Sequence, residues 1–147
     1  MAKFVYSMQS ILNVKYKLES QEKIAYANAQ AQLRREEEKL KHFKDRRQFY
    51  ENKMRGKMEE KLDVRALYEC NQGIEVMKLA IQEQKKNVEA AQKGVDKAQE
   101  KLNEAMKERK TYEKLRENAF EEFVKELNAQ ESKEIDELVS YNYATTV

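Results

Sequence analysis

Residue types that carry out catalysis are scarce in this sequence and do not cluster. It holds one histidine, His42, and one cysteine, Cys70, which cannot form a zinc site together, and it has no H-E-x-x-H or C-x-x-C motif. The three glycines, Gly56, Gly73 and Gly94, are isolated, so no glycine-rich loop could hold a phosphate. Carboxylates are abundant, but on exposed helices they have no pocket that would shift a pKa. We therefore expect no enzyme activity, no cofactor and no metal site.

The aromatic side chains indicate a different chemistry, that of docking to another protein. Phe43, Phe49 and Tyr50 lie close together in the first half, and Tyr68 follows near the middle of the chain. Phe49 and Tyr50 are adjacent and would face about 100° apart on a helix, so they cannot both lie in one helix–helix seam. An exposed aromatic residue is a good anchor for a partner. From the sequence alone, docking and internal packing are equally reasonable roles for these residues.

Composition restricts the fold that must position these side chains. The chain has 147 residues, no proline and only three glycines, too few turn residues for a compact domain of this size. Charged residues make up 38%, yet 29 Lys and Arg nearly balance 27 Asp and Glu, unlike most disordered chains. The net charge of +2 also argues against general nucleic-acid binding. Long helices in a coiled coil fit these numbers best.

The composition also indicates the cellular compartment of the chain. No stretch of about 18 apolar residues exists, so we expect no insertion into a membrane. Residues 1–12 lack the apolar run of a signal peptide, and a single cysteine rules out an intramolecular disulfide. These features favour the cytoplasm.

Heptad periodicity is clearest in the second half of the chain. One column of branched apolar residues repeats every seven positions, and a second column three residues later is rich in alanine. The pattern changes phase at Arg109, which predicts a local change in supercoiling without a break in the helix. The two columns contain Ile74, Ile81, Val88, Val95 and Leu102, and Met77, Gln84, Ala91, Ala98 and Ala105.

The first half has a rougher helical seam. One column contains Tyr26, Leu33, Leu40 and Met54 with Arg47 among them, and its neighbour contains Ala29, Glu36, Phe43 and Tyr50. The alternation of Phe4, Tyr6 and Met8 predicts that the chain begins in an extended conformation.

Two long seams in one chain predict an all-α fold, a long antiparallel two-helix coiled-coil hairpin. The turn could lie between Gly56 and Asp63, or at Asn71-Gln-Gly73. We favour the first, because it places Leu33 opposite Val88 and Ala29 opposite Ala91. The resulting single domain, residues 1–147, has helices at about 7–56 and 64–139, a turn at about 57–63 and a frayed tail at 140–147.

A turn near residue 60 leaves the second helix longer than the first. The C-terminal helix would then overhang its partner by about 30 residues. An uncovered apolar stripe usually marks a partner surface, and fraying or packing on a second copy is the alternative. The overhang carries Phe120, Phe123, Val124, Leu127, Ile135 and Leu138, and nothing else in the chain is expected to cover them.

Three segments resemble the FliJ family of flagellar export proteins. Residues 4–15, beginning Phe4-Val-Tyr6-Ser-Met8, are similar to the family's opening F-x-[FY]-x-L pattern. The Ile74–Gln84 heptads and the charged Gln130–Leu138 segment match the family's pattern after the turn and near the end. Together they span nearly the whole chain in the expected order.

The resemblance implies a component of the bacterial flagellar type III protein export apparatus. Such a coiled-coil stalk binds the ring of the export ATPase FliI, promotes its assembly and activity, and couples it to the cytoplasmic region of the export gate protein FlhA. It also implies handling of export chaperones and peripheral association with the cytoplasmic face of the cell membrane. We expect a monomer in solution, with no binding to nucleic acid.

The resemblance also implies where the two partners bind. The residues at the two chain ends would face the ATPase ring, and those near the turn would face the gate. Where the family often has aromatic residues after the turn, this chain has Cys70-Asn-Gln-Gly73, with Tyr68 slightly displaced. The ring candidates are Phe4, Ile11, Leu12, Phe123, Leu127, Ile135 and Leu138, and the gate candidates are Phe43, Arg47, Tyr50, Ile74, Met77 and Ile81.

Two other functions are consistent with a helical hairpin. One is the equivalent stalk of a virulence type III secretion system, which resembles the N-terminal segment less well. The other is a general coiled-coil scaffold or chaperone-like protein, such as a prefoldin subunit, which would require β-hairpins that the sequence does not predict.

Overall fold

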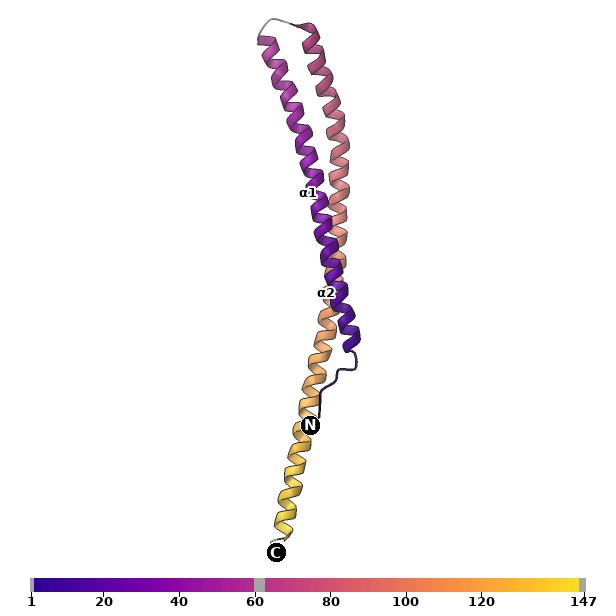
Figure 1. Cartoon of the computed structure of the whole chain (residues 1–147), viewed down its shortest axis with the longest axis vertical. Coiled ribbons are helices and arrows are strands. Elements are labelled where there is room, and N and C mark those ends of the chain that lie inside the picture. The colour runs from indigo at the N-terminus through magenta and orange to yellow at the C-terminus, as the bar shows by residue number, and fades with distance from the viewer. Residues whose placement is uncertain (1, 60–62, 146–147) are drawn as a thin grey trace. The chain divides into compact units, whose positions relative to one another are not determined.

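The computed structural model describes residues 2–59 and 63–145, with the backbone alone for residues 57–59. It contains two long helices, α1 (Gln9–Glu59) and α2 (Val64–Thr145), which run antiparallel and pack on each other (Figure 1). No strand occurs among these residues. The all-α helical hairpin predicted from the heptads is therefore confirmed.

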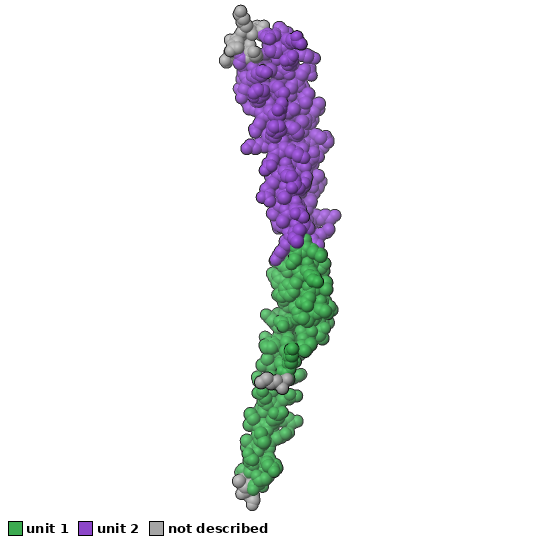
Figure 2. Space-filling view, in the orientation of Figure 1, with its two compact units in different colours: residues 1–21, 103–147 green, residues 22–102 purple. Residues whose placement is uncertain are grey.

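Contacts divide the chain into two compact units (Figure 2). Unit 1 comprises residues 1–21 and 103–147, and unit 2 comprises residues 22–102. Each unit pairs a segment of α1 with a segment of α2, so each has a helix–helix seam of its own.

The helices end at residues that differ from those expected. α1 continues through Gly56 to Glu59, so Gly56 does not end the helix. α2 continues to Thr145, six residues past the end expected at 139, so residues 140–145 are helical. Residues 60–62 of the predicted turn at 57–63 lie outside the described part of the chain, and residues 57–59 belong to α1. Asn71-Gln-Gly73 lies inside α2, which excludes the alternative turn.

The first turn of α2 is capped as the sequence predicted. Asp63 precedes the helix, and its Oδ1 accepts hydrogen bonds from the backbone N–H groups of Arg65 (3.2 Å) and Ala66 (3.4 Å). These two donors have no partner within the helix, so the carboxylate stabilises the first turn by about 1 kcal/mol.

The seam of unit 2 follows the predicted columns. Ile74, Ile81 and Val95 are buried, and the other positions of both α2 columns up to Leu102 are buried or half-buried. Ala29 and Ala91 line one hollow of the seam, which confirms the register that placed them opposite each other. The register preferred from the sequence is therefore the one the structure adopts.

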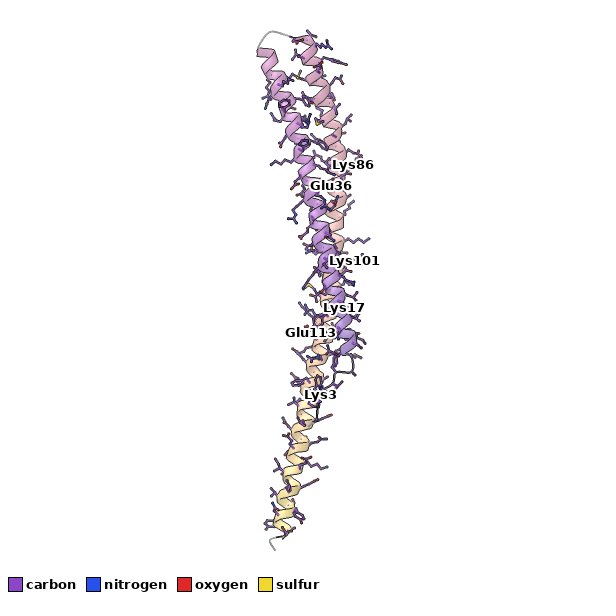
Figure 3. All side chains as sticks on the ribbon, viewed as in Figure 1. Lys3, Lys17, Glu36, Lys86, Lys101 and Glu113 are labelled. Carbon is purple, nitrogen blue, oxygen red and sulfur yellow. The ribbon has the colours of Figure 1, made fainter. Side chains whose placement is uncertain are left out.

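A buried polar pair interrupts this apolar seam. Gln84 is 5% exposed, and its Nε2 donates to the backbone oxygen of Glu36 (2.8 Å) and to Glu36 Oε2 (2.5 Å). Figure 3 labels Glu36 on α1. A shift of one helix along the other would separate the Gln84 amide from both of its Glu36 acceptors, so the pair favours a single register.

Unit 1 has a smaller core built around Leu12. Leu12 is 2% exposed, the most buried large side chain among the described residues. About two turns further along α1, Glu19 is also buried, and Arg109 of α2 donates to both its carboxylate oxygens at 2.6 and 3.2 Å. The phase change predicted at Arg109 thus coincides with an ion pair in the seam.

Two glycines in α2 are expected to differ in how substitution by alanine changes the stability of the fold. A Cβ at Gly94 would meet nothing within 4 Å, whereas one at Gly73 would lie 2.9 Å from Cζ of Tyr50. We expect Gly94→Ala to stabilise the fold by about 0.5–1 kcal/mol, because alanine has the higher helix propensity. Gly73→Ala should lack this gain, because the Tyr50 ring must move. Urea unfolding followed by circular dichroism measures both; equal gains would contradict the close packing of Tyr50 on Gly73.

Candidate functional site

The N-terminal residues cover part of the overhang that the sequence analysis left uncovered. The ring of Phe4 packs against Phe120 (centroids 5.2 Å apart) and Phe123 (5.5 Å), and the Arg116 guanidinium lies over it at 5.8 Å. The expectation that nothing in the chain covers Phe120 and Phe123 was therefore wrong. The cause is the extended start of the chain, which passes beyond the first residue of α1 and reaches α2.

Side-chain exposure along α2 changes after Leu127. Residues 128–145 are all exposed, whereas Phe123, Val124 and Leu127 are half-buried. Five large side chains in this exposed stretch we call the terminal face. The terminal face consists of Ile135 (60% exposed), Leu138 (60%), Val139 (61%), Tyr141 (67%) and Tyr143 (77%).

The predicted ring-contact residues fall into three environments. Leu12 is a core residue and cannot contact a partner in the folded chain, although its neighbour Ile11 is 40% exposed. Phe4, Phe123 and Leu127 are half-buried, and Phe4 and Phe123 pack on each other. Of the predicted set, Ile11, Ile135 and Leu138 are exposed to a partner without rearrangement, and Ile135 and Leu138 are the more exposed.

The predicted gate-contact residues belong mainly to the seam of unit 2. Ile74 and Ile81 are 8% and 6% exposed, Met77 is half-buried, and Tyr50 packs on Gly73. The heptad columns that placed these residues together also place them between the helices. These residues therefore lie between α1 and α2 and are not part of an exposed surface near the turn.

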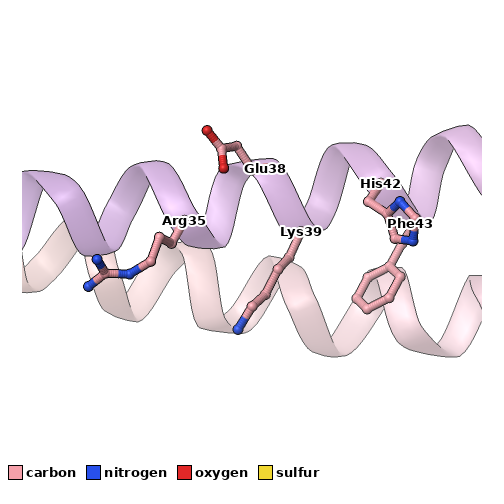
Figure 4. Close-up of a pocket in the computed structure, with 5 residues that line it drawn as sticks. All are labelled: Arg35, Glu38, Lys39, His42 and Phe43. Carbon is pink, nitrogen blue, oxygen red and sulfur yellow. The ribbon is translucent and has the colours of Figure 1, made fainter.

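Phe43 and Arg47 are only partly covered. Phe43 lines a hollow of about 320 Å³ together with Arg35, Glu38, Lys39 and His42, all from α1 (Figure 4). In the close-up Glu38 points away from the side of α1 on which Phe43 lies. Arg47 donates to Glu51 at 3.0 Å, one turn further along α1. This hollow combines an aromatic wall with a mainly basic rim.

An apolar face on α2 was not predicted from the sequence. We call Val64, Tyr68, Val76 and Leu79 the outer face; they are 75%, 63%, 55% and 68% exposed. At about 100° per residue these four lie within an arc of about 120°, opposite the buried positions of the same stretch. The spacing of these four residues could have predicted the face, but the heptad columns are the stronger signal in the same stretch. Phe49 of α1 is also exposed, at 60%.

An exposed hydrogen-bonded cluster links the helices of unit 1. Glu113, labelled in Figure 3, accepts a short hydrogen bond from the Tyr16 hydroxyl and one from Arg109 at 3.0 Å. The Tyr16 hydrogen bond is the main cause that lowers the pKa of Glu113, and the same bond raises the pKa of Tyr16. The Tyr16–Glu113 hydrogen bond joins α1 to α2.

The lowered pKa of Glu113 predicts a pH-dependent contribution to stability. The contribution is present above the ordinary carboxyl pKa of 4.5 and is lost as the pH falls through the lower folded-state value. Tyr16→Phe should lower the thermal midpoint at pH 7, and the difference from wild type should shrink at pH 3. Thermal unfolding at both pH values measures this, with Tyr141→Phe as the exposed control. A difference that is the same at pH 3 would contradict the role of Glu113.

Features of other kinds of site are not found in the part of the chain that the structure describes. Residues 2–59 and 63–145 contain no group of three or more His, Cys, Asp or Glu side chains placed to hold a metal ion. Within the same ranges, no helix is both long and apolar enough to cross a bilayer. His42 is exposed, and Cys70 is buried in the seam with its thiol free.

Comparisons with known proteins agree with the hairpin. A solved structure of a YscO homolog from Chlamydia trachomatis, CT670, matches with a TM-score of 0.67 over 96% of both chains at 23% identity, which shows a shared fold. No curated protein sequence matches the chain. The family model described as flagellar FliJ protein matches residues 4–146. The chain therefore belongs to the FliJ family, whose members are structural components of the type III export apparatus.

Proposed function

We propose that this chain is a non-enzymatic coupling subunit of the flagellar type III export apparatus. Its terminal face binds the ring of the export ATPase FliI, and its outer face binds the cytoplasmic region of the gate protein FlhA. The observation that carries the proposal is the pair of exposed apolar faces, one in each unit, on a chain of the FliJ family. Exposed apolar side chains grouped on one helix are typical of partner surfaces.

The terminal face is suited to insertion into a partner. Residues 128–145 form about five turns of exposed helix, and Ile135 and Leu138 share one side of it. An amphipathic helix with such anchors binds by laying its apolar side in a groove. The matching ATPase surface would therefore be apolar, as expected for the inner wall of a ring that receives a helix.

The outer face lies on a different unit with a different charge. Residues 34–55 of α1 in the same unit carry nine Lys and Arg against five Asp and Glu, a net charge of +4. Residues 128–145 of unit 1 carry four acidic residues against one lysine, a net charge of −3. Because the two surfaces have opposite charge, they favour different partners. Two partners, one for each unit, fit the role of a coupling subunit.

The ATPase contact is tested by adding the purified chain to FliI. We expect co-purification of the two proteins and a higher rate of ATP hydrolysis, with more hexamer on a sizing column. No change in the hydrolysis rate at a molar excess of the chain would contradict the proposal.

The gate contact is tested with substitutions on the outer face. Tyr68→Ala combined with Leu79→Ala should weaken capture of the FlhA cytoplasmic region by about 10-fold or more, because exposed aromatic and apolar anchors dominate binding energies. Stimulation of the ATPase should be unchanged. Ile24→Ala is the matched control, since Ile24 is an equally exposed apolar residue of unit 2 away from the outer face. Unchanged capture would place the gate contact elsewhere.

The flagellar role is proposed in preference to the virulence stalk. The family match is to the flagellar proteins and covers residues 4–146, whereas the YscO homolog shares the fold at 23% identity. We further propose that the chain acts in the cytoplasm and reaches the membrane face only through the export apparatus. Handling of export chaperones would be a second activity of the same stalk.

A further inference from the structure

The start of the chain forms a short strap against α2. Residues 2–6 are not helical, and the Phe4 ring lies on Phe120 and Phe123 of α2 within unit 1. We call residues 2–6 the N-terminal strap. It covers an apolar part of α2 that would otherwise be exposed.

Few contacts hold the N-terminal strap in place. The Tyr6 hydroxyl donates to the backbone oxygen of Tyr112 at 3.3 Å, and Tyr6 is 9% exposed. Phe4 is only half-buried, and Val5 is 77% exposed. The strap lies outside both helices, so the residues from Phe4 outward could leave α2 without breaking a helical hydrogen bond.

The surface beneath the strap continues into the terminal face. At about 100° per residue, Phe120 and Phe123 share an arc of about 120° with Ile135 and Leu138. The strap covers part of the first pair, since Phe123 is half-buried and Phe120 is still 49% exposed, and the second pair is exposed. A partner helix or groove that binds Ile135 and Leu138 and follows the stripe toward unit 1 would meet the strap.

We propose that the N-terminal strap is an autoinhibitory cover, displaced when the ATPase binds the full apolar stripe of α2. This proposal rests on the proposed function. The occupant is a surface of the ATPase that is apolar along the stripe and basic at its edges. The basic edges follow from residues 117–145, which carry eight acidic residues against two lysines.

If the N-terminal strap competes with the ATPase for the apolar stripe of α2, weakening the strap should strengthen binding of the ATPase. If the strap covers the stripe most of the time, the measured affinity is reduced by the fraction of chains in which the stripe is free. Phe4→Ala should therefore raise the affinity for the ATPase by about 3- to 10-fold. Val5→Ala is the control in the same segment, because Val5 is largely exposed, and it should leave the affinity unchanged.

Displacement can be observed directly, because the chain contains no tryptophan. Phe4→Trp keeps an aromatic ring on Phe120 and Phe123, and 5-fluorotryptophan incorporated only in this chain gives a single ¹⁹F signal. The reference signal for a released strap comes from the same label in a chain that also carries Phe120→Ala and Phe123→Ala. In that variant the labelled ring lacks the two rings on which it packs. On addition of the ATPase we expect the signal to move to the released position.

The outcomes separate this inference from the function on which it rests. If the wild-type chain does not bind the ATPase, both proposals fail. If it binds and the ¹⁹F signal stays at its starting position, or moves further from the released position, only the strap proposal fails. Weaker binding of Phe4→Ala would show that Phe4 is itself a contact, and equal binding would show that the strap does not compete; either result overturns the inference.

Discussion

Replacing Leu12 with alanine is expected to lower the free energy of unfolding by about 2–5 kcal/mol. Leu12 is 2% exposed, so the substitution removes buried methyl groups and leaves a cavity where α1 meets α2 in unit 1. The loss should be large for this fold, because a two-helix unit has few other buried side chains to compensate. Urea unfolding followed by circular dichroism gives the free energy.

The adjacent residue supplies the control. Ile11 has the same number of side-chain carbons and lies one position earlier in α1, but it is 40% exposed. Ile11→Ala should lower the free energy of unfolding by about 1 kcal/mol or less, because less apolar surface is removed from contact. Similar losses for the two variants would show that Leu12 is not the centre of this core. Hydrogen exchange should place the effect of Leu12→Ala in residues 9–21 and 103–127.

The second large effect is on function. The double variant Ile135→Glu with Leu138→Glu is expected to reduce stimulation of the export ATPase by about 10-fold or more, because two anchors of the contact become charged. The fold should not change, since both residues are 60% exposed and every residue from 128 to 145 is exposed. The hydrolysis rate at increasing concentrations of the chain measures the effect.

A charge-matched variant tests whether the apolar side is responsible. Gln130→Glu with Ser140→Glu adds the same charge to the same exposed helix, but away from the side that carries Ile135 and Leu138. It should keep most of the stimulation at physiological salt. Equal losses in the two double variants would mean that added negative charge, and not the apolar anchors, weakens binding.

Much of the fold could be predicted because one signal dominates the sequence. Ile74, Ile81 and Val95 repeat at heptad spacing, and a helix pair can bury them in only one register that also brings Ala29 to Ala91. A lack of proline permits helices as long as α2. Periodicity reports which residues face a seam, and this was sufficient for the hairpin.

The candidate surfaces were harder to predict for the same reason. Periodicity led the gate prediction to Ile74 and Ile81, which are buried because they belong to the seam. The exposed Tyr68 and Leu79 lie outside the heptad columns, and their accessibility in the structure identifies the outer face. Accessibility depends on which side of α2 meets α1, and that requires the packed structure.

The N-terminal strap shows a second kind of limit. Five residues without helical periodicity carry no register, and the alternation of Phe4 and Tyr6 predicts only an extended segment. Its destination on Phe120 and Phe123 is a contact between residues more than 100 positions apart. Only the folded chain reveals that contact, and with it the correction to the extent of the uncovered overhang.

The central claim is that the chain binds the export ATPase through the exposed end of α2. Hydrogen exchange of the full-length chain, measured with and without the ATPase, tests it most directly. We predict slower exchange in residues 128–145 when the ATPase is present and no change in residues 22–102. Protection confined to residues 22–102, or no protection anywhere at saturating ATPase, would contradict the claim.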